Sequence, residues 1–220
     1  MWAGQSPQDG EYRGGVDGWR RCAQSLWFLV SDVPEETTEL ECVMSGWRGL
    51  LLIRQDRCVT ECEADLVALL RELDDPEWLE WPRGYDRVET GAQFDGLVAR
   101  LEGDFAAPCG NERDTQDSSE YGRVTVPADA TVCGTRIVVC VSKFGSLALV
   151  CADNPGAFLG TGEAQAEGEL DAADLDRVNR ALSDLGYAIV PEELLECDYA
   201  GPSRLYVQRP TWWHRFFGSF

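Results

Sequence analysis

The chain has 220 residues, of which 44% are hydrophobic and 10% aromatic, and this apolar content excludes a wholly disordered protein. Its 39 acidic side chains outnumber its 19 basic ones, for a formal net charge of −20. Such a charge repels nucleic-acid phosphates and anionic lipids. We therefore expect neither nucleic acid nor a membrane surface among its partners.

The nine cysteines favour buried thiols over disulfides. Their number is odd, and several lie inside apolar runs such as residues 137–141 and 147–151, where a free cysteine behaves as a small hydrophobic residue. The N-terminal residues carry no basic and apolar signal sequence, and no run reaches the roughly 18 apolar residues of a membrane span. We expect a cytoplasmic protein with reduced thiols.

In the first half, a glycine-containing segment is followed by strands and two helices. Residues 1–21 are expected to form a flexible lead-in, and three strands are predicted at 25–30, 39–45 and 49–54. Thr60 with Glu63 forms a capping-box pattern that begins a helix, and Asp74-Asp75-Pro76 ends it. A second helix is predicted from Thr90 to Phe105, with an aromatic connector, Trp78-Leu-Glu-Trp-Pro82, between the two.

The second half begins after residues 107–121, whose polar, turn-rich composition indicates a linker or loop. A strand is predicted at 123–126, followed by a hairpin at 135–142 and 146–151. After a Gly/Ala/Glu loop at 155–169, a helix is predicted at 171–185 and a strand at 187–190. A short helix follows Pro191, and residues 204–207 are an optional edge strand. Because no regular βαβ alternation runs through the chain, the order indicates α+β: a mainly antiparallel sheet with three to four amphipathic helices packed on it. We predict α+β subdomains at 22–106 and 122–220, with packing into a single domain as the alternative.

Motifs for catalysis, cofactors and metals are missing from the sequence. Cys58 and Cys62 have tolerable zinc spacing, but Cys62 also lies on the apolar face of the first helix. His214 is the only histidine, and no Gly-x-Ser-x-Gly, P-loop or calcium-loop pattern occurs. The sequence therefore predicts no catalytic, cofactor-binding or metal-binding residues.

Two short segments concentrate acidic residues that lack an evident local partner. Carboxylates crowded in this way repel one another, and a basic partner would offset that repulsion. The predicted partner-binding carboxylates are Glu35, Glu36, Glu39 and Glu41 in the first segment, and Asp74, Asp75, Glu77 and Glu80 in the second.

The C-terminal ten residues contain five aromatic side chains together with His214 and Arg215. One interpretation is a terminal helix that closes the core. The other is a docking segment, because exposed aromatic residues beside arginine are typical of binding hot spots. Trp212 and Trp213 are accordingly added to the candidate partner-binding residues.

Together these features predict an acidic, non-enzymatic cytoplasmic interaction protein of bacterial type. It would neutralise or regulate a basic protein partner, as an immunity protein or antitoxin does. An interaction module without any toxin connection is a second hypothesis. The enzymatic alternative is a carboxylate-based, small-molecule enzyme, which would require converging acids in a deep pocket.

Overall fold

The computed structural model describes residues 61–113 and 118–218. The predicted lead-in at 1–21 and the predicted strands at 25–30, 39–45 and 49–54 lie outside these residues. The chain divides into two units, Met1–Cys62 and Glu63–Phe220, and every contact given below lies within the second.

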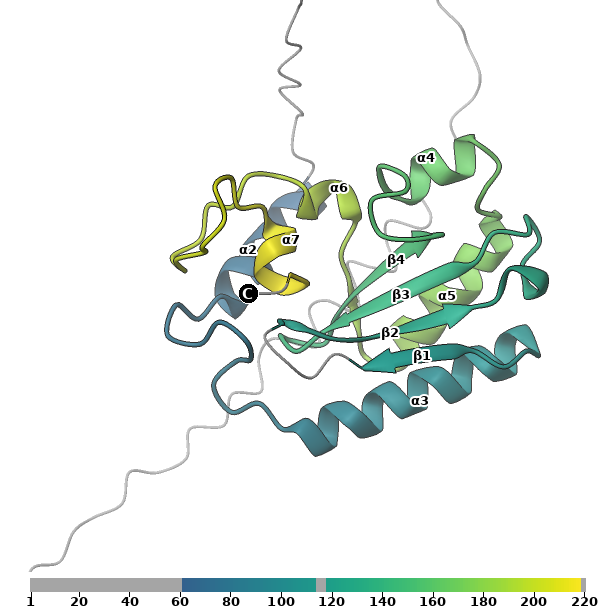
Figure 1. Ribbon diagram of the computed structural model, residues 1–220, viewed down its shortest axis with the longest axis horizontal. Helices are drawn as coiled ribbons and strands as arrows, with labels where there is room; N and C mark the ends of the chain where they lie inside the picture. The colour runs from purple at the N-terminus through teal and green to yellow at the C-terminus, as the bar shows by residue number, and fades with distance from the viewer. Residues whose placement is uncertain (1–60, 114–117, 219–220) are drawn as a thin grey trace, which may run out of the picture. The chain divides into compact units, whose positions relative to one another are not determined.

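The described part folds around a five-stranded, mostly antiparallel sheet with helices on both faces (Figure 1), a mixed architecture consistent with the α+β class. The spatial order of the strands follows the chain, and neighbours from β1 to β4 are antiparallel. The last strand, β5, runs parallel to β4. The strands are β1 Gly110–Arg113, β2 Glu120–Val126, β3 Ile137–Ser142, β4 Leu147–Ala152 and β5 Ala188–Ile189.

The hairpin of β3 and β4 is the centre of the sheet and confirms the predicted hairpin. Every residue of both strands is buried, so their nearly continuous apolar sequences match strands covered on both faces. The turn between them contains Gly145 at φ +59° and Ser146 at φ +52°. Gly145 tolerates this left-handed backbone because it lacks a Cβ, whereas Ser146 adopts it at a steric cost.

Residues 107–121, expected to form a linker or loop, contain β1 and the first residues of β2. All four residues of β1, an edge strand, are exposed, and its polar composition resembles that of a loop. The optional strand at 204–207 does not form; these residues are irregular.

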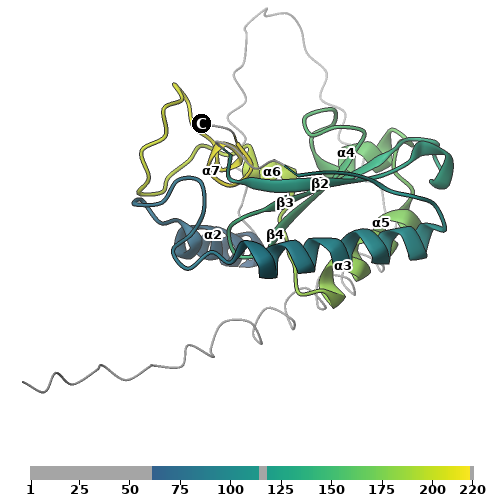
Figure 2. The same ribbon diagram turned by 60° about the horizontal axis from the view of Figure 1, so that its bottom comes forward.

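One face of the sheet is covered by α3, Arg87–Phe105, and α5, Ala172–Asp184, which lie side by side (Figure 2). Helix α3 begins three residues before the predicted cap Thr90, because the Asp86 carboxylate accepts the Val88 amide at 2.8 Å and caps the helix. Among the described residues, no helix is both long and apolar enough to cross a membrane. The first core cluster includes Phe94, Leu97, Leu101, Val124, Val139, Val150, Val178 and Leu182.

The other face carries a second apolar cluster, formed with α2, α6 and α7. These helices span Glu61–Leu73, Glu192–Leu195 and Trp212–Phe216. A further helix, α4 (Gly160–Ala166), lies in the expected loop at 155–169 and contacts β4, and a 3₁₀ turn spans Ala128–Ala130. The second cluster includes Leu70, Val138, Cys140, Phe144, Leu149, Leu195, Trp212, Phe216 and Phe217.

The packing of Phe216 generates a stability prediction. Its ring is fully buried and meets Phe144 edge to face at a centroid distance of 5.6 Å. We expect Phe216→Ala to lower the free energy of unfolding by about 3–5 kcal/mol, because truncation leaves a cavity. Tyr206→Ala, at a side chain that is 93% exposed, should change it by less than about 0.5 kcal/mol. Urea denaturation measures both, and equal losses would contradict this packing.

Candidate functional site

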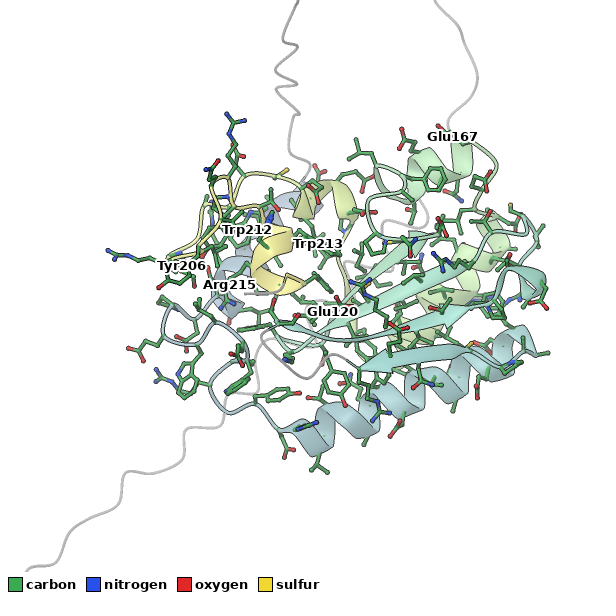
Figure 3. The ribbon with its side chains drawn as sticks, viewed as in Figure 1. Glu120, Glu167, Tyr206, Trp212, Trp213 and Arg215 are labelled. Carbon is green, nitrogen blue, oxygen red and sulfur yellow. The ribbon has the colours of Figure 1, made fainter. Side chains whose placement is uncertain are left out.

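Six of the ten predicted partner-binding residues lie in the described part of the chain, and Figure 3 shows two of them, Trp212 and Trp213, on the same helix as Arg215. They belong to the connector between α2 and α3 and to α7. The four in the earlier segment, Glu35, Glu36, Glu39 and Glu41, lie outside the described residues. The six are Asp74, Asp75, Glu77, Glu80, Trp212 and Trp213.

A fully buried arginine of α7 joins the two regions. The Arg215 Nε donates a hydrogen bond to Asp74 Oδ1 at 2.5 Å. The Nη atoms donate to the backbone carbonyls of Leu79 at 2.9 Å, Trp78 at 3.0 Å and Asp75 at 3.2 Å. The planar guanidinium, whose donors lie in a fixed fork, therefore binds a carboxylate and three backbone carbonyls of the connector at once.

Asp74 also holds the loop that precedes α7. Its carboxylate accepts hydrogen bonds from Ser203 Oγ at 2.5 Å and from the Tyr199 hydroxyl. The Tyr199 hydroxyl in turn accepts the Ser203 amide at 2.7 Å. Asp74 was predicted to be free for a partner, but the structure buries it among these groups. The reason is the ion pair with Arg215, a residue 141 positions away that local sequence does not reveal.

The two tryptophans of α7 pack against the protein body. Trp212 is 2% exposed, stacks on Phe216 and meets Tyr199 edge to face at 4.9 Å. Trp213 is half-buried and stacks on Phe217 at 5.5 Å. The interpretation of this segment as a terminal helix that closes the core is thus confirmed. Trp212 is not accessible to a partner, and only part of Trp213 is.

The connector whose backbone carbonyls Arg215 binds also presents side chains to solvent. Glu77 is largely exposed, Trp78 and Trp81 are 40% and 37% exposed, and Asp75 and Glu80 are half-buried. We call these five residues the connector surface. Sequence reasoning selected its carboxylates but not its tryptophans, although the indole pair between two helices was a visible signal.

The connector surface already holds one guanidinium group. The exposed Arg83 donates from Nη2 to Glu77 Oε2 at 2.8 Å, and its Nε lies 3.9 Å from Asp75 Oδ2. Exposed ion pairs of this kind contribute little to stability. The contact shows that the carboxylates are spaced to receive an arginine side chain.

A cavity of about 250 Å³ adjoins the connector, between residues 82–93 and the turn after β3. Its carboxylates do not converge as an acid–base pair, because Asp86 caps α3 and both Asp86 and Glu89 are exposed. The Tyr187 hydroxyl lacks a hydrogen-bond partner, and burial raises its pKa. It is a neutral phenol at neutral pH and not a base.

Buried thiols and carboxylates gather on the side of the sheet that faces α6. Cys151 Sγ lies 3.6 Å from Glu192 Oε2, and Arg123 pairs with both oxygens of Glu120. Burial raises the pKa of Cys140 and Cys151, so both stay protonated and are poor nucleophiles. No group of three or more potential metal ligands occurs within residues 61–113 and 118–218.

Comparisons with protein-family models, curated proteins and solved structures gave no match.

The buried ion pair predicts that Arg215 contributes far more to stability than Arg83 does. Arg215→Met should lower the free energy of unfolding by about 3–5 kcal/mol, because it leaves the Asp74 carboxylate buried without its cation. Adding Asp74→Asn should restore part of that loss, since the uncompensated charge disappears. Arg83→Met should cost less than about 1 kcal/mol. Urea denaturation of the four proteins tests this, and similar losses for Arg215→Met and Arg83→Met would contradict it.

Thiol exposure predicts an order of alkylation in the native protein. Cys133 and Cys197 are exposed, whereas Cys109, Cys140 and Cys151 are buried free thiols. Iodoacetamide at pH 8 should modify the first two at least 100-fold faster than Cys140 and Cys151. Peptide mass spectrometry resolves the sites. Modification of all five at one rate would show that the sheet opens readily.

Proposed function

We propose that this protein is a non-enzymatic, cytoplasmic interaction protein that neutralises or regulates a basic protein partner, in the manner of an immunity protein or antitoxin. The observation that carries the proposal is the connector surface. Two partly exposed indoles stand among three carboxylates, and a buried arginine holds the backbone beneath them. The partner is a protein segment that presents arginine or lysine side chains.

The chemistry of the surface suits such a segment. A guanidinium or ammonium group gains energy over an indole face, about 0.5–1 kcal/mol at exposed sites and more when desolvated. Carboxylates beside the ring add charge-assisted hydrogen bonds. Arg83 makes the carboxylate contacts within the chain, where it pairs with Glu77 and approaches Asp75.

The connector backbone is already ordered before a partner binds, which favours binding there over binding at a flexible loop. Arg215 holds the carbonyls of Asp75, Trp78 and Leu79, so the indoles start from a fixed backbone. Ordering a loop on binding costs free energy, and a loop already ordered avoids that cost. The net charge of −20 would also speed the approach of a basic partner at low salt.

The enzymatic alternative would place a reaction in the 250 Å³ cavity beside the connector. Its two carboxylates are exposed, and one of them caps α3. The interaction hypothesis therefore has the stronger structural support.

A peptide titration tests the connector surface directly. The probe is a capped hexa-arginine peptide, and its affinity for the full-length protein is measured by calorimetry at low salt. The paired variants Trp78→Ala/Trp81→Ala and Glu77→Gln/Glu80→Gln should each weaken binding at least tenfold. The association rate, measured by stopped-flow tryptophan fluorescence, should fall steeply as salt rises, because exposed charges are screened within about 8 Å at physiological ionic strength.

Matched controls separate this surface from the general negative charge. Val132→Ala/Leu159→Ala removes two exposed apolar side chains elsewhere, and Glu112→Gln/Glu167→Gln removes the same number of charges from β1 and from the residue that caps the C-terminus of α4. Both controls should bind within about twofold of the parent protein. Equal weakening by the connector and control variants would refute a localised surface and leave only diffuse attraction.

A further inference from the structure

A small cavity lies next to the only parallel strand pair in the described residues, at its carboxyl end. Its volume is about 110 Å³, and its lining includes Val150 of β4, Ile189 of β5 and the residues that follow β5. Ligands of open sheets with parallel strands commonly bind outside the carboxyl ends of those strands. The position is independent of the connector surface and of the function proposed for it.

The cavity wall is apolar on most sides and polar at three side chains. Val150, Leu175, Ile189, Val190 and Pro191 supply the apolar part. The polar side chains are Thr161, Asn179 and Glu192. Small-ligand pockets are usually lined by apolar side chains with a few polar groups among them.

Two of the polar side chains have unused hydrogen-bond acceptors. Asn179 Oδ1 is buried and has no hydrogen-bond partner. Glu192 is 4% exposed, and its carboxylate accepts the Gly156 amide at 2.7 Å and lies 3.6 Å from Cys151 Sγ. Because a carboxylate has about four acceptor positions, two remain open.

In the part of the chain that the structure describes, the carboxylate also has no cation beside it. Within the described residues, no arginine, lysine or histidine nitrogen lies within 4 Å of Glu192. Burial raises the pKa of Glu192, and the nearby Glu196 and Glu193 raise it further. From residue 153 to 198 the chain carries twelve acidic side chains and two arginines, so the surroundings attract positive charge.

We propose that this cavity binds a primary alkylammonium group, either a small free amine or the end of a lysine side chain. An ammonium group has three donors, which correspond to Glu192, Asn179 Oδ1 and the Thr161 hydroxyl. Its alkyl chain would lie against Val150, Ile189 and Val190. The volume equals that of about four water molecules at ~30 Å³ each, which suits a chain of four or five heavy atoms.

The probe is n-butylammonium chloride, titrated into the full-length protein with ¹³C-labelled methyl groups at constant ionic strength. We expect saturable NMR shifts at the methyl groups of Val150, Ile189 and Val190. Neutral n-butanol and anionic butyrate should bind at least tenfold more weakly. Equal binding of n-butanol, or no saturable shift because the cavity holds only water, would overturn the proposal.

A capped Gly-Lys-Gly peptide distinguishes the two sources of the ammonium group. Methyl shifts that match those of n-butylammonium would assign the site to a lysine side chain. Binding of n-butylammonium alone would assign it to a small free amine. Both results support an ammonium site.

Variants then test the individual contacts. Glu192→Gln keeps an acceptor for Gly156 but removes the charge, and it should weaken n-butylammonium binding at least tenfold. Asn179→Leu is nearly isosteric and should weaken binding several-fold, while the melting temperature stays equal or rises because the unpartnered oxygen is gone. Because n-butylammonium binding to Asn179→Leu is measured with Glu192 intact, the proposal remains testable even if Glu192→Gln fails to fold.

The control variants are Glu193→Gln in the same helix and Glu196→Gln at its C-terminal cap, and neither residue lines the cavity. They should bind n-butylammonium within twofold of the parent protein. If they weaken binding as much as Glu192→Gln does, or if Asn179→Leu binds normally, the cavity is not the site.

Discussion

The buried ion pair between Arg215 and Asp74 determines the arrangement of one whole end of this protein. An isolated charge in a protein interior is costly, so each member of the pair depends on the other and on further hydrogen bonds. Arg215 satisfies its donors with one carboxylate and three connector carbonyls, and its guanidinium lies 4.3 Å from the centre of the Phe144 ring. Asp74 in turn orders Tyr199 and Ser203. Two side chains therefore position three chain segments: the connector, the loop that precedes α7, and α7 itself.

This arrangement divides the acidic residues near α2 into two groups with different roles. Asp74 points into the protein and is used for structure. Glu77 faces solvent, beside indoles whose backbone the same arginine holds. Asp74 and Glu77 lie three positions apart in the same acidic connector, and their roles differ because Asp74 meets a buried cation. Charge density along a sequence does not separate such roles; the position of the counter-charge does.

The two faces of the sheet also differ in how they satisfy polar groups. The face under α3 and α5 is closed mainly by leucine, valine and phenylalanine. The opposite face carries Glu120, Arg123, Cys140 and Cys151, and a buried carboxylate, Glu192, lies near it at the start of α6. Buried polar groups need complete hydrogen bonding, and three buried side-chain oxygens in the described residues, Asp174 Oδ1, Asn179 Oδ1 and the Tyr187 hydroxyl, are exceptions. A small polar ligand at the carboxyl end of β4 and β5 would account for the Asn179 oxygen.

The sequence by itself determined those helices and strands whose sequence patterns lie within a few neighbouring residues. The β3–β4 hairpin, α5 with its Asp171 cap and the terminal helix all follow from apolar periodicity, turn residues and capping residues within a few positions of one another. The sequence could not place β1, because an exposed edge strand has the composition of a loop, or pair β5 in parallel with β4. Nor could it match Arg215 to Asp74 across 141 positions, or bring Asn179 and Glu192 to one cavity. These features depend on which distant segments the fold brings together, and only the tertiary structure decides that.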